Sequence, residues 1–306
     1  MPYIDIISGF LGSGKTTFLR QLAGRVYAGQ RIAVIENDFG DVSIDAERLG
    51  AEGLLVSELT AGCVCCSLTA RLQGMMGEIL RTFSPDRILL EPSGVARLSD
   101  VLRAVDSVCR DTPLRKGMVC TLAAPLPRRE YARQFLSVYK NQLQSASLIL
   151  PTRMELLAAE QRESFLDFLR ETAPGTFLLE RDWRSLSDTE LAQLVQQPPA
   201  PVQTQARSFI RVPASEADSF TSVFAGTCAP ARLKAALKEL GGAPERYGCV
   251  LRVKGALQSV DGPLQVDYTP GGCFLQLCAK ADNRLVFIGS GMQRAAIRRA
   301  LQSTFE

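Results

Sequence analysis

The sequence predicts an α/β fold: a parallel sheet with helices on both faces, followed by a smaller α+β domain. In residues 1–195, short apolar runs alternate with helical patterns, which is typical of parallel sheets whose strands are joined by helices. A stretch rich in Pro and Gln then interrupts the alternation, and short strand patterns dominate beyond it. We therefore expect an α/β domain over residues 1–195, a linker over 196–205 and an α+β domain over 206–306.

The first domain should begin with a buried strand. Residues 3–7 are short, β-branched and apolar, and residues 17–27 place Phe18, Leu19 and Leu22 at helical spacing. Further strands are expected at 31–36, 87–91, 118–123 and 147–150, with helices near 68–82, 98–108, 128–143 and 155–172. Ligands of such sheets bind at the carboxyl ends of the strands.

The second domain should be built mainly from antiparallel strands. The strand patterns lie at 206–212, 248–255, 264–268, 273–279 and 284–289, and helical stretches lie near 230–240 and 291–303.

The composition excludes several classes of protein. A net charge of +3, from 35 basic and 32 acidic residues, implies neither a nucleic-acid nor an anionic membrane partner. No uncharged apolar run approaches the roughly 20 residues of a membrane span. We expect the N-terminus to enter a strand directly, without a signal peptide. Nine cysteines, an odd number, favour reduced thiols and a cytoplasmic location. Because the chain has no histidine, a metal site must use thiolates, carboxylates, backbone or water.

A glycine-rich loop carries the strongest functional signal. Residues 9–16 read GFLGSGKT and stand between the first strand and the first helix, where the amides of a phosphate-binding loop can face a polyphosphate. Lys15 can reach the β- and γ-phosphates, and Thr16 can offer its hydroxyl to Mg²⁺. The predicted nucleotide-binding residues here are Gly9, Gly12, Ser13, Gly14, Lys15, Thr16 and Thr17. The alternative is an ordinary Gly-rich turn.

Glu91-Pro92-Ser93-Gly94 follows an apolar strand, as the second magnesium motif of phosphate-loop proteins does. Glu91 can hold Mg²⁺ through water, and the amide of Gly94 can contact a γ-phosphate. The alternative is a strand followed by a Pro turn.

Three clustered thiols predict a transition-metal site. Cys63, Cys65 and Cys66 are soft ligands for Zn²⁺, Cu⁺ or Co²⁺, with a position left for another donor. Buried apolar cysteines and a redox or vicinal-disulfide role are the alternatives. The six scattered cysteines are expected to be core filler.

An acidic segment follows the second strand. Glu36, Asp38 and Asp45 should lie near the mouth of the phosphate loop, where they could hold magnesium or water. A solvated acidic loop is the alternative.

Together these motifs resemble the CobW family of P-loop GTPases, which are metal chaperones and maturation factors. The resemblance covers nearly the whole chain and rests on motifs at 9–17, 36–40 with Asp45, 62–66, 91–94, 252–255 and 285–289. It implies a P-loop NTPase sheet and a CobW-type C-terminal domain. It also implies that Cys63, Cys65 and Cys66 bind a transition metal, with Glu36 as a further ligand.

The chain departs from the family pattern in its base-reading motif. Thr152, Arg153 and Glu155 stand where Asn, Lys and Asp are usual. Glu155 keeps a carboxylate that can accept from guanine, and Arg153 can stack on the base, but Thr152 cannot replace the amide. A weakened guanine preference is therefore expected. Ala123 stands near the end of the fourth strand, where the family usually has an acidic residue. The His-rich stretches that many family members carry are absent from this sequence.

The resulting hypothesis is a GTP-binding, slowly hydrolysing metal chaperone or a metalloenzyme or corrinoid maturation factor. GTP or GDP, Mg²⁺ and either Zn²⁺ or Co²⁺ would be its ligands, and a client metalloenzyme or cofactor-assembly protein its partner. Lys15, Glu91 and Asp38 are the predicted catalytic residues. Alternatives are a non-hydrolysing nucleotide-dependent adaptor, a redox or metal sensor, and a P-loop small-molecule kinase, in which the thiol cluster would have no role.

Overall fold

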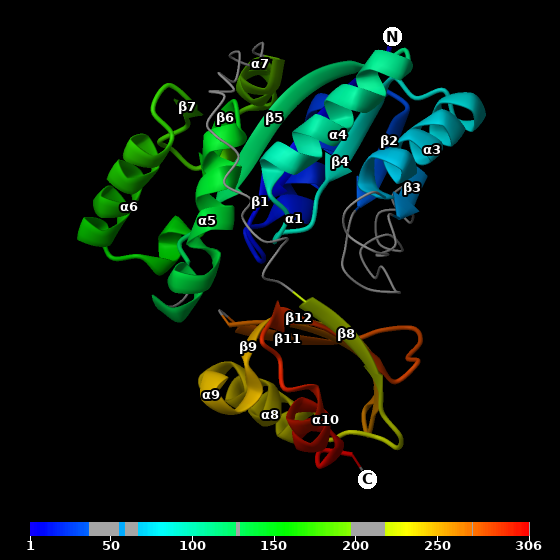
Figure 1. The fold of residues 1–306 in the computed structure, drawn as a ribbon, viewed down its shortest axis with the longest axis vertical. Helices are drawn as coiled ribbons and strands as arrows, with labels where there is room; N and C mark the ends of the chain where they lie inside the picture. The colour runs from blue at the N-terminus through cyan, green and yellow to red at the C-terminus, as the bar shows by residue number, and fades with distance from the viewer. Residues whose placement is uncertain (37–54, 59–66, 127–128, 197–217, 271, 306) are drawn as a thin grey trace. The chain divides into compact units, whose positions relative to one another are not determined.

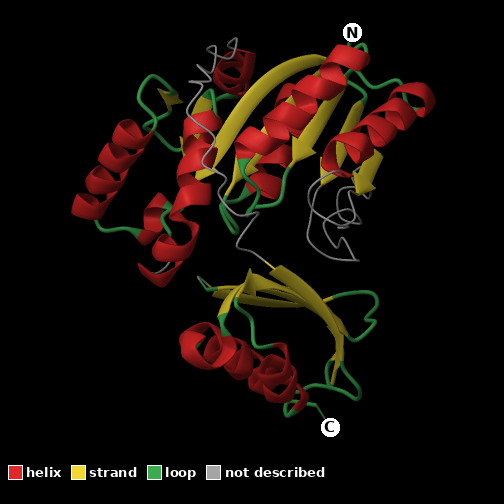
Figure 2. Ribbon diagram, viewed as in Figure 1, coloured by secondary structure: helices red, strands yellow, loops and turns green. Residues whose placement is uncertain are grey.

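The computed structural model describes residues 1–36, 55–58, 67–126, 129–196, 218–270 and 272–305 (Figure 1). The chain divides into two compact units, the second of which contains β8 and everything after it. Each unit has its own sheet and helices (Figure 2) and is described separately.

The first unit is built on a seven-stranded sheet in the order β3-β2-β4-β1-β5-β6-β7. Every pairing in it is parallel. The central strands are buried along almost their whole length, which explains why they appear in the sequence as continuous apolar runs. The strands are β1 (Tyr3–Gly9), β2 (Ile32–Glu36), β3 (Leu55–Glu58), β4 (Arg87–Glu91), β5 (Arg115–Ala123), β6 (Leu148–Pro151) and β7 (Phe177–Leu178).

Helices cover both faces of this sheet (Figures 1 and 2). One face carries α3, α4 and α5, and the other carries α1 with α7. The last turn of the first helix widens into a π-helix, η1. The helical segments are α1 (Lys15–Gln21), η1 (Leu22–Val26), α3 (Ser67–Thr82), α4 (Leu98–Asp111), α5 (Arg129–Ser145), η2 (Met154–Leu156), α6 (Ala159–Thr172), η3 (Trp183–Ser185) and α7 (Asp188–Gln196).

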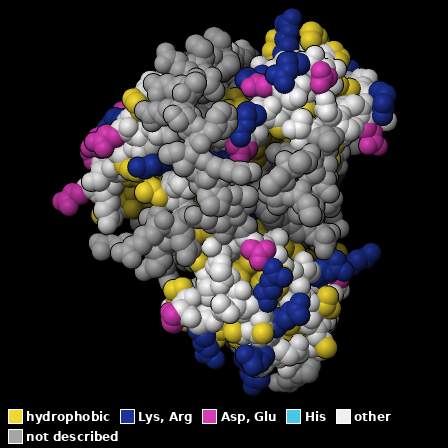
Figure 3. All heavy atoms as spheres, in the orientation of Figure 1, with side chains coloured by type: hydrophobic (Ala, Val, Ile, Leu, Met, Phe, Trp, Pro, Cys, Tyr) yellow, Lys and Arg dark blue, Asp and Glu magenta, His cyan; other side chains and the backbone are white. Residues whose placement is uncertain are grey.

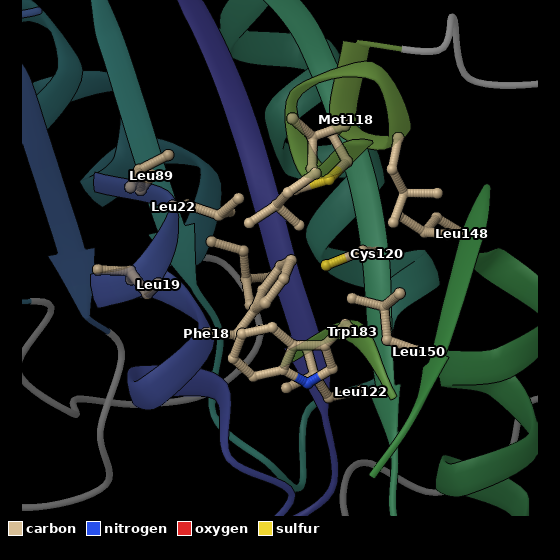
Figure 4. Close-up of a cluster of buried hydrophobic side chains, with 14 of the residues drawn as sticks. Phe18, Leu19, Leu22, Leu89, Met118, Cys120, Leu122, Leu148, Leu150 and Trp183 are labelled. Atoms are coloured by element: carbon tan, nitrogen blue, oxygen red, sulfur yellow. The ribbon is translucent and has the colours of Figure 1, made fainter. Parts of the chain in front are cut away.

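The core beneath α1 fixes the helix that follows the phosphate loop (Figure 4). Phe18, Leu19 and Leu22 are fully buried, as their helical spacing predicts. Phe18 meets Trp183 edge to face with ring centroids 4.9 Å apart, an arrangement that contributes about 0.5–1.5 kcal/mol beyond area burial. The helix is therefore anchored by its apolar face, and its N-terminus stays at the carboxyl end of β1.

A buried polar network ties β1 to its neighbours. Asp5 is fully buried and accepts hydrogen bonds from Arg87 (2.7 Å), Tyr27 (2.8 Å) and the backbone N–H of Met118 (2.8 Å). Burial, followed by the charge of Asp5, raises the pKa of the Tyr27 hydroxyl. A Cβ at position 117 would lie only 2.1 Å from Asp5 Oδ1, so this position requires Gly117. The Asp5 carboxylate is thus satisfied by partners from two strands, β4 and β5, and from the end of η1.

The second unit is a five-stranded antiparallel sheet in the order β11-β10-β9-β12-β8. Helices α8 and α10 pack on one of its faces around a core that includes Leu233, Leu237, Phe287 and Ile297. Its elements are β8 (Asp218–Val223), α8 (Pro230–Gly242), α9 (Pro244–Tyr247), β9 (Cys249–Ser259), β10 (Gly262–Thr269), β11 (Gly272–Leu277), β12 (Arg284–Ser290) and α10 (Arg294–Gln302).

The predicted fold class is confirmed: a parallel sheet with helices on both faces precedes a smaller α+β unit. The expected strand at 206–212 and all but the first residue of the expected linker lie outside the described residues. The prediction missed β3, β7, β8, η3, α7 and α9. The expectation that the scattered cysteines fill the core was wrong for Cys109 and Cys278, which are only partly buried; Cys273 is also partly buried but packs against the core of the second unit.

Among the described residues of the first unit on the face drawn in Figure 3, Lys and Arg side chains are interspersed with Asp and Glu side chains. None of the helices in the part of the chain that the structure describes is both long and apolar enough to span a bilayer.

Candidate functional site

The phosphate loop connects β1 directly to α1, and its glycines adopt backbone conformations that other residues avoid. The φ angles of Gly9, Gly12 and Gly14 are 145°, 76° and 95°. A Cβ on Gly9 would also lie 2.5 Å from the carbonyl oxygen of Leu122 on β5. The glycine pattern therefore has a steric cause, and the loop can present its amides at the N-terminus of α1.

The loop is closed by its own hydrogen bonds. The amide of Ser13 donates to Phe10 O (3.2 Å), and the amide of Phe18 donates to Gly14 O (3.0 Å). Ser13 is 1% exposed, and its hydroxyl has no hydrogen-bond partner among the described residues. Thr17 is exposed on the first turn of α1. A buried hydroxyl without a partner is a costly arrangement that an incoming polar ligand would relieve.

Lys15, Thr16 and Glu91 meet at the carboxyl ends of β1 and β4. Lys15 Nζ lies 3.7 Å from Glu91 Oε1, and the Thr16 hydroxyl donates to Glu91 Oε2 at 3.2 Å. Both charged side chains are largely buried, at 5% and 13% exposed. A hydroxyl and a carboxylate are the hard oxygen ligands that suit Mg²⁺, so these residues fit that ion. The sequence-predicted neighbours are thus brought together.

Glu36 lies on the strand next to Glu91. In the parallel sheet Glu36 pairs in register with Glu91 on β4 and with Glu58 on β3, which places all three at one edge. Glu36 is buried, at 5% exposed. The other predicted transition-metal ligands (Cys63, Cys65 and Cys66) and the acidic residues Asp38 and Asp45 lie outside the described residues.

Within the described residues, no cluster of three or more Cys, Asp or Glu side chains is placed to hold a metal ion. The transition-metal site therefore stays a prediction from the sequence.

The loop after β4 packs closely on the phosphate loop. A Cβ on Gly94 would lie 2.7 Å from Leu11 N and 2.8 Å from Leu11 Cδ2. From the other side, the buried side chain of Gln142 on α5 donates to the carbonyls of Gly94 (3.1 Å) and Ala96 (2.9 Å). Sequence reasoning missed Gln142, because no local pattern marks a helical glutamine whose partners lie more than 40 residues away.

The predicted base-reading segment follows β6. Thr152 is buried and its amide donates to the carbonyl of Ala123 at 2.8 Å, while its hydroxyl has no partner within the described parts of the chain. Arg153 adopts a left-handed conformation (φ 59°) and its Nε lies 3.4 Å from Gly12 O. Glu155 is exposed in η2. Arg153 therefore reaches the phosphate loop, and the motif lies beside the same carboxyl edge.

The two protein-family models that match this chain agree with its two-unit architecture. The family described as "CobW/HypB/UreG, nucleotide-binding domain" matches residues 3–177, and "Cobalamin synthesis protein cobW C-terminal domain" matches residues 217–305. Among solved structures, Zn(II)-bound YjiA GTPase from Escherichia coli aligns over 100% of this chain and 99% of its own, with 19% identity and a TM-score of 0.43.

Curated relatives match the chain at moderate identity. The zinc chaperone YjiA of Escherichia coli is 31% identical over 179 residues, covering 56% of this chain and 55% of YjiA. The zinc chaperone YeiR of the same organism is 29% identical over 165 residues, covering 54% and 50%. The chain thus spans about half the length of the curated relatives it matches. With a nucleotide-binding match over more than half of its length and a C-terminal match after it, the chain belongs to the CobW family.

Proposed function

We propose that this protein is a GTP-dependent metal chaperone, with zinc or cobalt as cargo and a metalloenzyme or cofactor-assembly protein as client. The observation that carries the nucleotide part is the cluster of Lys15, Thr16 and Glu91 at the end of a glycine loop with three positive φ angles. The metal part is supported by the thiol cluster in the sequence and by relatives that are named zinc chaperones.

Nucleotide binding would rearrange the contacts of this cluster. Lys15 faces Glu91 in the structure, and a triphosphate would offer the Lys15 ammonium the β- and γ-phosphates as further anionic partners. Bound Mg²⁺ would neutralise charge developing on the phosphates. Thr16 and Glu91 are the residues that would hold the ion, directly or through water. The hydroxyls of Ser13 and Thr152, which have no hydrogen-bond partner among the described residues, would gain partners from the ligand.

Intrinsic hydrolysis should be slow. The chain contains no histidine that could act as a base. Of the proposed catalytic residues Lys15, Glu91 and Asp38, Lys15 and Glu91 contact each other and Thr16 donates to Glu91. These contacts oppose a role as base for Lys15 or Glu91. Catalysis then rests on positioning and on charge stabilisation, as it does in other P-loop GTPases, which commonly need a partner for full rates.

The metal would be bound by Cys63, Cys65 and Cys66, with Glu36 as a further ligand. Glu36 is a neighbour in register of Glu91, so the metal site and the Mg²⁺ site would share one sheet edge. A γ-phosphate that orders this edge would change the affinity of the protein for its cargo metal. Hydrolysis of the γ-phosphate would return the affinity to its earlier value.

The test is to measure metal affinity in two nucleotide states. Protein purified anaerobically should bind about one Zn²⁺ or Co²⁺ per chain, more tightly with a GTP analogue than with GDP, by a factor of about 5 to 150. Thiolate-to-Co²⁺ charge-transfer absorption should disappear in a Cys65→Ser/Cys66→Ser variant. Equal metal affinity in the two nucleotide states would refute the switch and favour a static metal site or a redox cysteine cluster.

Base preference needs a separate test, because the Thr152 and Glu155 positions depart from the family pattern. Guanine should be preferred only loosely, and Thr152→Asn with Glu155→Asp should sharpen the preference. ATP that displaces labelled GTP as well as GTP does would contradict a guanine preference.

The same departure favours one rival, a nucleotide-dependent adaptor that does not hydrolyse. Its signature is tight nucleotide binding without turnover, even with metal and partner present.

A further inference from the structure

Gln142 is a fully buried amide on the inner face of α5. Its Nε2 donates two hydrogen bonds, to Gly94 O at 3.1 Å and to Ala96 O at 2.9 Å. Because both partners are carbonyl oxygens, which only accept, the orientation of the amide follows from its surroundings. One side chain thus holds two backbone carbonyls of the loop that follows Glu91.

The position of Gln142 is itself fixed. The hydroxyl of Thr121 on β5 donates to the backbone carbonyl of Gln142 at 2.9 Å, and Asn141 accepts from the amide of Ser99 at 3.2 Å. The helix is thereby tied to the central sheet on one side and to the start of α4 on the other. The amide of Gln142 consequently acts from a rigid support on a loop that contains no regular structure.

The buried amide has an energetic cost. Its Oε1 is buried and has no hydrogen-bond partner among the described residues. Leaving such an acceptor unpaired is unfavourable, and a methionine would fill similar space without that penalty. The two donated hydrogen bonds are the contribution that a methionine cannot make.

The loop that Gln142 holds is the one that approaches the phosphate loop. Gly94 lies so near Leu11 that an added Cβ would be 2.7 Å from Leu11 N. Ser93 reinforces the turn by accepting from Ala96 N at 2.9 Å. The loop of residues 92–96 therefore approaches the phosphate loop closely at Gly94 and is hydrogen-bonded to Gln142 at Gly94 and Ala96.

We propose that Gln142 is a positioning residue that holds residues 92–96 closed against the phosphate loop, so that the γ-phosphate of a triphosphate meets a preformed Gly94 amide. This inference rests on the proposed nucleotide binding and deepens it, since it assigns discrimination between triphosphate and diphosphate to a residue that touches neither. A diphosphate has no γ-phosphate and is held by the phosphate loop alone. Loss of Gln142 should therefore weaken triphosphate binding selectively.

The test compares Gln142→Met with the wild type by calorimetry, using a non-hydrolysable GTP analogue and GDP with Mg²⁺. The analogue should bind about tenfold more weakly to the variant, while GDP affinity changes less than about twofold. Gln142→Asn keeps an amide in the buried polar site but moves it back by one methylene. Its affinity for the analogue should lie between those of the wild type and Gln142→Met. It also provides the measurement if the methionine variant does not fold.

Tyr139→Phe is the matched control. Tyr139 is buried on the same helix, and its hydroxyl donates to the carbonyl of Ala124 at 2.8 Å rather than to residues 92–96. Its ring meets Phe10 of the phosphate loop edge to face, a contact that a phenylalanine ring keeps. This variant should leave the ratio of the two affinities unchanged. Equal losses for both nucleotides, or no loss, in the Gln142 variants would overturn the positioning role. Absence of nucleotide binding in the wild type would instead refute the proposed function, and with it this inference.

Discussion

A methyl group added at position 94 (Gly94→Ala) should push the loop of residues 92–96 away from the phosphate loop. In the structure, a Cβ added at this position would meet Leu11 N at 2.7 Å and Leu11 Cα at 3.0 Å, both backbone atoms. Ordinary contact begins at 3.4 Å, so one loop must move by about 0.7 Å relative to the other. Backbone cannot rotate away as a side chain tip can, and the displacement therefore falls on the loop geometry itself.

The magnitude follows from the cost of overpacking. Inserting a methyl group into a well-packed site costs about 1–3 kcal/mol, which corresponds to a loss of about 5- to 150-fold in affinity if binding must restore the closed geometry. The loss should fall on the triphosphate, since only a γ-phosphate needs the Gly94 loop in place. GDP should bind with nearly wild-type affinity.

The assay is calorimetry of Gly94→Ala with a GTP analogue and with GDP, beside Gly77→Ala as a control. Gly77 lies in α3, and a Cβ there meets no atom within 4 Å. The control should bind both nucleotides normally and unfold at slightly higher denaturant, because alanine stabilises a helix interior by about 0.5–1 kcal/mol. Gly94→Ala protein that binds the analogue within twofold of wild type would refute the reasoning.

Three further predictions concern charges. Lys15→Ala should weaken triphosphate binding at least about tenfold, and unchanged affinity by calorimetry would contradict the phosphate-loop assignment. Asp5→Asn should lower the free energy of unfolding in urea by about 3 kcal/mol, because it leaves the largely buried Arg87 without its charge partner; a loss below about 1 kcal/mol would show that the network relaxes. Glu190 accepts a backbone hydrogen bond at the start of α7, which lowers its pKa from 4.5 to about 2. Its contribution to stability should be complete above pH 4.5 and should be lost as the pH falls toward 2, so unfolding curves of wild type and Glu190→Gln should converge over that interval.

The parts of the site that could be predicted are those written in local spacing. The glycines of the phosphate loop, Lys15 and Thr16 follow one another within eight residues, and Glu91 ends a neighbouring apolar strand. Because carboxyl ends of adjacent parallel strands meet at one edge, the contact between Lys15 and Glu91 follows from the motifs and the predicted sheet.

Two of the missed elements show different reasons for the failure: β8 lacks a regular apolar pattern, whereas α7 begins with a recognisable capping sequence. In β8 the inward positions are Phe220 and Ser222, and Ser222 can be buried only because Arg298 of α10 donates to its hydroxyl at 2.8 Å. No local pattern shows that partner. By contrast, α7 begins with a capping box in which Ser187 and Glu190 exchange hydrogen bonds, and this signature is visible in the sequence.

The glycine motifs show why a recognisable pattern does not explain itself. Gly9 must lack a side chain because Leu122 O on β5 lies in the way, and Gly94 because Leu11 N does. Each cause is a backbone atom brought close by the fold, and the tie from Gln142 to Gly94 O has the same character. The chemistry of the site is thus encoded locally, whereas the geometry that makes it competent is set by contacts distant in sequence. Variants of Gln142 should therefore alter nucleotide discrimination although no motif contains this residue.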